Sequence, residues 1–454
     1  MAPGPRVAFF TPLPPVRSGI ADYSAELLPH LASLADVTAV TGDDHGSANA
    51  GDGRYAVMTV SRFSREETPH DVHVYQVANN AHHHGFMLPV LQETAGLLVL
   101  HDYCLQYLML GATLARGDLK GLTRLLAVEY GDEARVLTWR LLLNAIDPLS
   151  LSFAGGLIRA SEMVLVHSAF ARDRVLADHP DAVVRVIPMG VRGAPRLDEP
   201  AAARLRERLG IDPADLVVAS LSTPAHNKRL DLLVRAFRRA QACEPRLKLL
   251  ILGAGLLHRD ARAEIDRAPE GRVVCTGWLS ADEYRGAIDL SHLVADLRYP
   301  AAAETSASLL RALTAGKPAI IADQGPFSEL PDAACIRVPV GHTEEAHVAN
   351  AIARLAASPD LRQRMGRAAS DYAARACSPA RAADAYATCI EEALDRRRRG
   401  AAVVQRLPLG VRPSPVVSTV YKACRLGKLW RTYGASDTWR RLREELRRQR
   451  GVAS

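Results

Sequence analysis

Residues 292–323 read HLVADLRYPAAAETSASLLRALTAGKPAIIAD, and this stretch decides the fold class. The short apolar runs at 292–298 and 318–323 are suited to buried parallel strands. The leucine-rich segment between them predicts a helix that ends at Gly316 and Pro318, a C-terminal glycine followed by a residue that cannot continue a helix. Strand, turn, helix and strand make a βαβ unit, so we expect an α/β protein.

The start of this helix carries one carboxylate and three hydroxyls, which belong to Glu304, Thr305, Ser306 and Ser308. Free backbone N–H groups at a helix start attract phosphate, by about 0.3–1 kcal/mol per charge. A carboxylate next to such a site is suited to holding a sugar hydroxyl. The alternative is that these side chains only cap the helix.

Strand-like runs alternate with helical patterns in both halves of the chain, which indicates parallel sheets covered on both faces. In the first half the runs are 6–10, 36–42, 71–77, 96–102, 163–168 and 184–190, with a helix from about Ile20 to Leu34. In the second half they are 216–222, 247–253, 272–277, 293–298 and 318–323. Residues 190–202 are rich in Gly, Pro and charge and predict a hinge.

We therefore expect two facing, Rossmann-like, doubly wound domains. Their limits are placed at 1–195 and 210–377, followed by a helix at 378–399 that crosses back to the first domain and a basic extension at 400–454. In open α/β sheets, ligands bind at the carboxyl ends of the strands, so the site is expected in a cleft between the two sets of loops.

Composition agrees with a large globular protein. The chain has 454 residues, 48% of them apolar and 24% charged, which is enough for two sizeable cores. Its seven cysteines include no CxxC pair, so neither a zinc site nor a disulfide framework is predicted. The N-terminal apolar run is broken early by prolines, unlike a signal peptide, and no run approaches a spanning helix. We expect a cytoplasmic protein.

The positive charge lies at the C-terminus. The net charge is +7, and residues 421–450 hold ten Lys or Arg against three acidic residues, so the remainder is close to neutral. A nucleic-acid partner is therefore not predicted. Residues 412–454 mix aromatic and basic side chains, which suits the anionic inner face of a membrane. Alternatively, Trp430 and Trp439 dock on the body of the protein and the charges face water.

In the first half, two loops carry candidate site residues. Gly19 precedes the first helix and would let backbone amides approach a phosphate, although a purely structural turn is the alternative. His101 follows the strand that ends near residue 100, and the alternative is an incidental histidine beside a capping Asp102. Ser168 is interpreted as an ordinary N-cap.

In the second half, Lys228 and Arg229 open an amphipathic helix, where cations oppose the helix dipole unless they bind an anion. Gly277 and Trp278 end another strand and could flank a nucleobase, or Trp278 could belong to the core. A dinucleotide motif after the strand 247–253 is rejected, because its third glycine would fall at His258.

Three consecutive histidines, His82 to His84, point in different directions and lack acidic partners nearby in the sequence. We interpret them as a solvated or acceptor-side loop rather than a metal site, and we predict that the protein needs no metal and no cofactor.

Taken together, these loops resemble the retaining glycosyltransferases of family 4, which have the GT-B architecture. The resemblance covers about residues 6–395 and is carried by five segments: PPVRSGIADYS (14–24), VLHD (99–102), NKRLDLLVRAF (227–237), TGWLSADEY (276–284) and ETSASLLRALTAGKPAII (304–321). It implies that the first domain is the acceptor side and the second the donor side. It also implies that Gly19 and Lys228 contact the donor diphosphate, that His101 approaches the donor sugar, and that Glu304 holds sugar hydroxyls.

The chain departs from the family pattern in two places. The family has a second Glu eight residues after the first, and this chain has Ala312 at that spacing from Glu304, or Arg311 when the position is counted back from Gly316. The Arg that usually lies upstream of the phosphate-binding Lys is also missing, and residues 222–224 are Ser, Thr and Pro.

The expected function is transfer of a hexose from a nucleotide-sugar to an unknown acceptor, with retention at the anomeric carbon. Two alternatives stay open. One is a nucleotide-sugar epimerase or hydrolase of the same architecture, and the other is a catalytically silent sugar-nucleotide-binding protein.

Overall fold

The computed structural model describes residues 4–45, 53–66, 69–147, 150–193, 197–221, 224–255, 257–301, 303–400, 404–407, 409, 413–434, 437–440 and 443. Residues 222 and 223, at the second departure from the family pattern, lie outside this set, as does most of the tail beyond 440.

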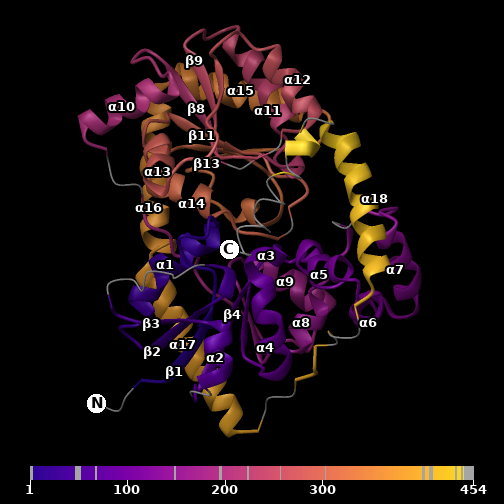
Figure 1. Ribbon diagram of the computed structural model, residues 1–454. Coiled ribbons are helices and arrows are strands. Elements are labelled where there is room, and N and C mark those ends of the chain that lie inside the picture. The colour runs from indigo at the N-terminus through magenta and orange to yellow at the C-terminus, as the bar shows by residue number, and fades with distance from the viewer. Residues whose placement is uncertain are drawn as a thin grey trace.

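Two parallel sheets lie one above the other in Figure 1. The first has the order β3-β2-β1-β4-β5-β6-β7 and the second β10-β9-β8-β11-β12-β13. The strands of the first sheet are β1 (Arg6–Phe10), β2 (Asp36–Thr41), β3 (Ala56–Thr59), β4 (Val72–Val77), β5 (Leu97–Leu100), β6 (Met163–Val166) and β7 (Val184–Val186). Those of the second are β8 (Leu216–Ser220), β9 (Leu247–Ile251), β10 (Val273–Cys275), β11 (Leu293–Asp296), β12 (Ala319–Ala322) and β13 (Cys335–Val338).

Helices cover both faces of each sheet. Around the first sheet these are α1 (Gly19–Leu31), α2 (Val60–Glu66), α3 (Ala81–His84), α4 (Leu88–Glu93), α5 (Gln106–Ala112), α6 (Leu119–Tyr130), α7 (Ala134–Leu142), α8 (Gly155–Arg159) and α9 (Ala169–Asp178). Around the second they are α10 (Glu199–Leu209), α11 (Leu230–Gln241), α12 (Arg259–Asp266), α13 (Ala281–Asp289), α14 (Ala307–Thr314), α15 (Glu344–Ala357) and α16 (Pro359–Ala376). The last two are α17 (Pro379–Arg398) and α18 (Pro415–Tyr433). The expected α/β fold with two facing doubly wound units is confirmed.

The sequence missed one edge strand in each sheet, and it extended the first helix too far. The strands β3 and β13 form edges of the two sheets and had not been predicted. The helix α1 ends at Leu31 rather than near Leu34, although it contains Pro29. The central unit β11-α14-β12 agrees closely with the prediction, and Ser306 is the N-cap of α14.

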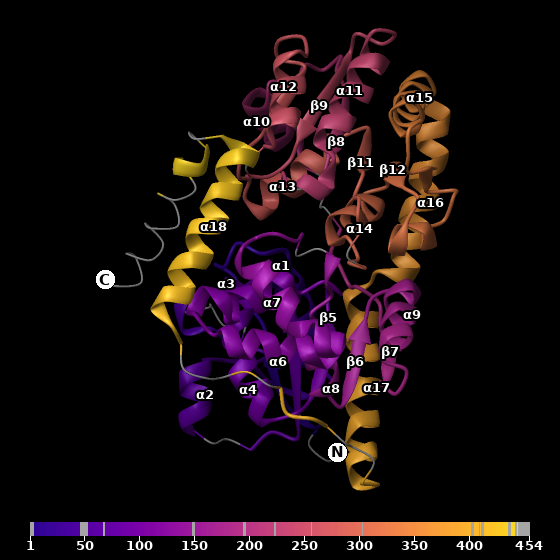
Figure 2. The same ribbon diagram turned by 90° about the vertical axis from the view of Figure 1, so that its right-hand side faces the viewer.

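The helix α17 carries the chain from the second unit back to the first, where it packs along α1 (Figure 2). Its Tyr386 is fully buried. Arg397, near its end, donates a hydrogen bond from Nη2 to Oε1 of Glu162 at 2.7 Å. This return joins the two units through a second covalent connection besides the linker near residue 193.

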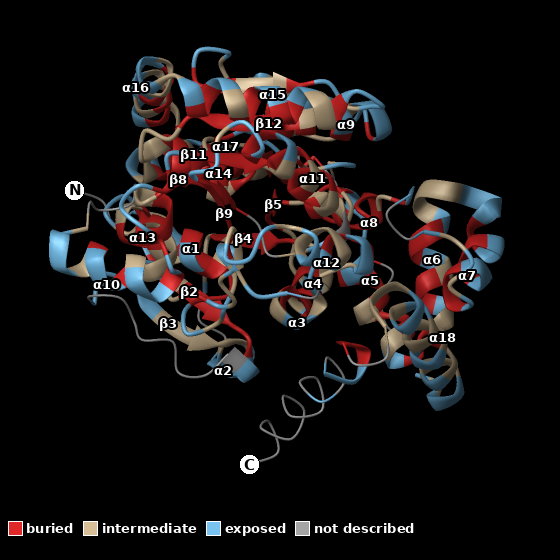
Figure 3. Cartoon of the chain, turned by 90° about the horizontal axis from the view of Figure 1, so that it is seen from above, coloured by how far each residue is buried: buried red, intermediate tan, exposed pale blue. Residues whose placement is uncertain are grey.

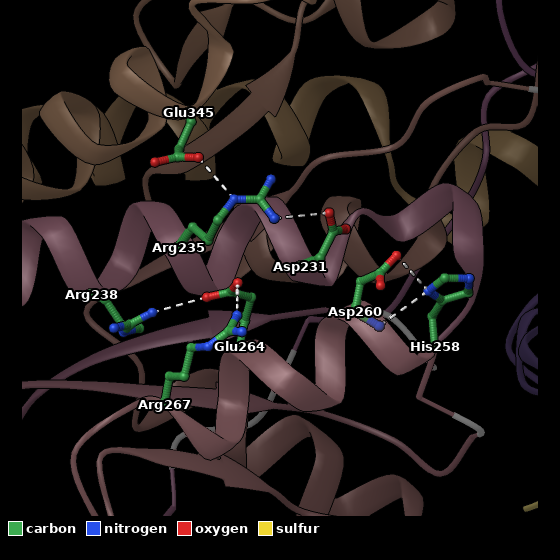
Figure 4. A network of polar contacts seen from close by, with 8 residues as sticks. All are labelled: Asp231, Arg235, Arg238, His258, Asp260, Glu264, Arg267 and Glu345. Atoms are coloured by element: carbon green, nitrogen blue, oxygen red, sulfur yellow. Dashed lines mark hydrogen bonds and ion pairs between the residues drawn. The ribbon is translucent and has the colours of Figure 1, made fainter. Parts of the chain in front are cut away.

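Charged residues fasten α12 and α15 to α11 on the second unit (Figure 4). Arg235 of α11 bonds to Glu345 of α15 at 2.9 Å. Arg238 of α11 bonds to Glu264 of α12 at 2.9 Å. At the start of α12, His258 accepts a hydrogen bond from the backbone N–H of Asp260. The helix α12 is therefore held to α11 through Glu264, and Arg259 at its start contacts α18.

The helix α18 spans the two units along one side of the molecule (Figures 1 and 2). At its start, Ser418 donates a hydrogen bond to the carbonyl of Ala115 at 2.8 Å, and Tyr421 is buried in the core of the first unit. Gly117 has a φ of 84°, and a side chain there would collide with the backbone of Ser414. Beyond the far end of α18, Asp437 pairs with Arg262 of α12 at 2.9 Å.

The docking of α18 does not use the tryptophans. Trp430 is 60% exposed and Trp439 is 63% exposed, so the alternative that both dock on the body is wrong. Figure 3 shows α18 and α7 at the same corner of the molecule, both with exposed segments. In the part of the chain that the structure describes, no helix is long and apolar enough to span a membrane.

Candidate active site

Arg298, which the sequence reading missed, organises the end of β11. Its guanidinium donates to Oδ1 of Asp296 at 2.9 Å, to Oε1 of Glu304 at 3.3 Å and to Oγ of Ser306 at 2.7 Å. The side chain of Arg298 is 12% exposed. Burial opposes its charge, but Asp296 and Glu304 raise the pKa of Arg298 above its ordinary value. The only sequence signal was an arginine inside a strand-end run, which is not specific.

The turn before α14 therefore does more than cap a helix. The Ser306 hydroxyl donates to Oδ2 of Asp296 at 2.7 Å and accepts the backbone N–H of Leu309 at 3.3 Å. Glu304 is buried beside Arg298. The Thr305 hydroxyl is buried and has no hydrogen-bond partner among the described residues. Ser306 belongs both to the helix cap and to the polar cluster, and ligand binding by this turn stays a prediction.

Lys228 lies close enough to Arg298, Asp296 and Glu304 to respond to their charges. It closes a single 3-10 turn (His226–Lys228) just before α11. Burial and the neighbouring Arg298 lower the pKa of Lys228 to about 8. Its ammonium makes no hydrogen bond or ion pair with any residue that the structure describes. A half-buried cation without a hydrogen-bond partner among the described residues, at a strand-end loop, is suited to binding a phosphate.

Asp102 brings the first unit into this cluster. It follows β5 and accepts the backbone N–H of Asn79 at 2.9 Å. Burial, reinforced by the charge of Glu304, raises the pKa of Asp102 to about 6, while Arg298 and Lys228 oppose the rise. The carboxyl ends of strands from both sheets therefore meet in one charge cluster, as the strand-end rule predicts.

His101, next to Asp102, is held by a chain of hydrogen bonds that runs through Gln76 and Tyr386 to Tyr23. Its Nε2 is 2.7 Å from Oε1 of Gln76, whose amide Nε2 donates to the hydroxyl of Tyr386 at 3.0 Å. Tyr386 is in turn 3.1 Å from the hydroxyl of Tyr23. Burial and the neighbouring His167 hold the pKa of His101 well below its usual range, so the ring is neutral. Neither Gln76 nor Tyr386 was recognised from the sequence.

The first loop meets the second unit at Trp278. The guanidinium of Arg17 lies 4.0 Å from the centre of the Trp278 ring. Trp278 is 47% exposed, so the alternative that it belongs to the core is wrong. Gly19 is the first residue of α1, and no atom lies within 4 Å of a Cβ built there or at Gly277. These residues line open space at the edge of the interface between the units.

Residues 202–372 match the family described as glycosyl transferases group 1. The matched part runs from α10 to α16 and so lies within the second unit. No curated protein sequence matches the chain.

Solved structures resemble the whole chain in fold. Sucrose-phosphate synthase from Thermosynechococcus elongatus superposes with a TM-score of 0.59 at 15% identity, over 87% of this chain and 99% of that chain. Alr3699/HepE from Anabaena, in complex with UDP-glucose, gives 0.57 at 15% identity over 87% and 100%. WaaG, a glycosyltransferase involved in lipopolysaccharide biosynthesis, gives 0.55 at 12% identity over 85% and 99%. These likenesses agree with the GT-B architecture.

Not every predicted site residue points into the charge cluster. Arg229 donates from Nη1 to Oε2 of the buried Glu344 at 2.6 Å and lies 5.4 Å over the ring of Tyr299. Only the remaining N–H groups of Arg229 could bind a nucleotide-sugar. The Ser308 hydroxyl neighbours the phenol of Tyr284, whose pKa burial raises to about 12.

The missing second Glu is replaced by an ion pair between the units. Arg311 of α14 donates to Oε1 of Glu26 in α1 at 2.6 Å, and both side chains are less than 10% exposed. Arg311 also donates to the carbonyl of Arg192 at 3.2 Å, whose N–H donates to Oε2 of Glu26 at 2.8 Å. Both members of the pair bond to the backbone of Arg192, which lies in the segment predicted to be a hinge.

The three histidines form the short helix α3 rather than a loop. His84 is buried, and its Nδ1 is 2.8 Å from the carbonyl of Gln76, so the interpretation of all three as solvated is wrong. Asn80 caps this helix by accepting the N–H of His82 at 2.9 Å. Among the described residues, no three His, Cys, Asp or Glu are grouped as metal ligands would be.

Proposed function

We propose that this glycosyltransferase moves a hexose from a nucleotide-sugar to an acceptor hydroxyl, with retention at the anomeric carbon. The observation that carries the proposal is the charge cluster of Lys228, Arg298, Glu304 and Asp102, formed where strand ends of both units meet. In the reaction, the acceptor oxygen bonds to the anomeric carbon, the bond to the diphosphate breaks, and the acceptor loses its hydroxyl proton. Retention is supported only by the family resemblance.

In this proposal Lys228 neutralises the charge that develops on the departing diphosphate. Preorganised cations of this kind act strongly because they need no rearrangement during the reaction. Glu304 would accept hydrogen bonds from sugar hydroxyls, and His101, being neutral, would offer its free ring nitrogen to the sugar side. Arg17 and Trp278 would flank the nucleotide from the two units.

The first test is the thermal stability of the protein with a panel of nucleotide-sugars, beginning with UDP-glucose. UDP and UDP-glucose are the ligands of the Anabaena structures, which makes them sensible first probes. A ligand at 100 times its dissociation constant stabilises by about 2.7 kcal/mol. Lys228→Ala is the matched control, and a shift that it shares with the wild type would place the ligand elsewhere.

A catalytically silent binding protein is the second candidate, favoured by the Glu26–Arg311 pair at the place of the second family Glu. Stabilisation by a donor without sugar transfer across an acceptor panel would select it. Release of free sugar without acceptor would instead select a hydrolase.

We also propose that transfer needs no metal ion, because Lys228 and Arg298 already supply positive charge to the cluster. Activity measured in excess chelator should equal activity in its absence. Loss of activity in chelator that magnesium or manganese restores would contradict this prediction.

A further inference from the structure

The outer face of α7 exposes large apolar side chains beside the charged residues Arg135 and Arg140. Val136 is 61% exposed, Trp139 is 56% exposed, and Leu143, just after the helix, is 57% exposed. Residues three and four positions apart lie on one face of a helix, so these three side chains form one stripe. The inner residues Leu137 and Leu141 are buried in the first unit. Large apolar side chains gathered on one helix face usually mark an interaction surface.

The neighbouring α18 exposes one large apolar side chain near each of its ends. Val416 is 71% exposed and Trp430 is 60% exposed. They are fourteen residues apart, which brings them to nearly the same side of the helix, since seven residues complete almost two turns. Tyr421, on another side, is buried and fastens the helix to the body. Val416 and Trp430 therefore stay exposed to solvent while Tyr421 holds α18 on the first unit.

The charge of α18 is of one sign. Residues 413–434 contain Lys422, Arg425, Lys428 and Arg431 and no acidic residue. Lys422, Lys428 and Arg431 are exposed and make no ion pair with any described residue. Basic residues beside exposed tryptophans are complementary to an anionic surface that also accepts apolar side chains.

We propose that α7 and α18 together form a docking surface for an anionic lipid bilayer. The two helices pack against each other and lie at the same corner of the molecule (Figures 1 and 3). Val136, Trp139, Val416 and Trp430 enter the interfacial layer, and the lysines of α18 neutralise lipid phosphates. Nucleic acid would match the charge but leave the aliphatic side chains Val136 and Leu143 without partners. The proposal is independent of the sugar-transfer chemistry.

The test is co-sedimentation of the full chain with vesicles of phosphatidylcholine alone or mixed with phosphatidylglycerol. Lys422→Glu combined with Lys428→Glu should weaken binding to the mixed vesicles by roughly 30-fold or more, since each basic residue near an anionic surface contributes about fivefold. Arg398→Glu with Arg399→Glu, an equal charge change on exposed residues at the end of α17, should leave binding nearly unchanged. Trp139→Ser with Trp430→Ser should also weaken binding. All four substituted side chains of α7 and α18 are exposed, so thermal unfolding should match the wild type.

Binding that requires phosphatidylglycerol, depends on salt and falls in both test variants supports the proposal. It is overturned by equal sedimentation with neutral vesicles, or by test variants that bind like the wild type. Release from vesicles by a single-stranded RNA, with RNA binding lost in the same variants, would assign the surface to nucleic acid and also overturn it.

Discussion

One guanidinium fixes two carboxylates and a hydroxyl at the end of β11. Because Arg298 bonds to Asp296, Glu304 and Ser306, these side chains are held in place before any ligand arrives. Lys228 has no such partners among the described residues, and burial lowers its pKa. The cluster therefore holds one positive charge that a bound phosphate would stabilise.

Replacing Lys228 by Ala should lower kcat/KM by about 10²–10³, the usual scale for one preorganised electrostatic group. Folding should be unaffected, because no described residue bonds to the ammonium. Steady-state kinetics with a thermal melt measure both quantities. Normal kinetics, or simple unfolding, would count against the assignment of Lys228.

The pKa of Lys228 predicts that kcat/KM falls at alkaline pH. Its pKa of about 8 means that the ammonium is charged below that pH and loses its proton above it. Donor capture needs the charged form, so kcat/KM should fall as the pH rises through about 8. Lys228→Arg stays charged, and its profile should lack this limb even if its rate is lower. An unchanged alkaline limb in the Arg variant would assign the titration to another group.

Glu304→Gln should preserve binding of a nucleoside diphosphate and lower the rate of sugar transfer by about 10²-fold. The amide keeps the shape of the side chain, and Asp296 still neutralises Arg298. Thermal shift with the diphosphate and a transfer assay separate the two effects. A variant that melts early yet keeps its specific activity would return Glu304 to a purely structural role.

Local patterns predicted the central elements of both sheets. The segments of β11, α14 and β12 are short and buried, and their start and stop residues are unambiguous, so the prediction of residues 292–323 agrees with the structure. The edge strands β3 and β13 were missed, and neither is fully buried. An edge strand needs no continuous apolar run, and that run was the signal used.

The site was predictable only where its residues belong to one segment. Glu304, Ser306 and Lys228 lie in the loops that follow β11 and β8, and the structure places them in or beside one cluster. Gln76 and Tyr386 contribute to the surroundings of His101 from positions 310 residues apart. Arg17 and Trp278 meet only because two units face each other. Such pairs have no spacing that a single sequence could reveal.

The Glu26–Arg311 pair should contribute strongly to the association of the two units. Removing one partner of a buried ion pair costs about 3–5 kcal/mol, because the other charge is left without a partner. Glu26→Gln alone should therefore lower the melting temperature clearly. Glu26→Leu combined with Arg311→Leu should cost less than the sum of the single changes.

A double-mutant cycle from thermal melts measures this coupling. Additive effects of the two single substitutions would mean that Glu26 and Arg311 do not stabilise each other, despite their 2.6 Å separation.

The return of α17 has a consequence for synthesis of the protein. The last strand of the first sheet ends at Val186, but Tyr386, which completes the surroundings of Gln76 and Tyr23, is made 200 residues later. At about 5–20 residues per second, a nascent chain waits roughly 10–40 s for this partner. During that time the apolar side of α1, with Leu27 and Leu31, has no α17 to cover it. The ribosome-bound first unit should therefore be a client of chaperones that shield apolar helices until the last part of the chain emerges.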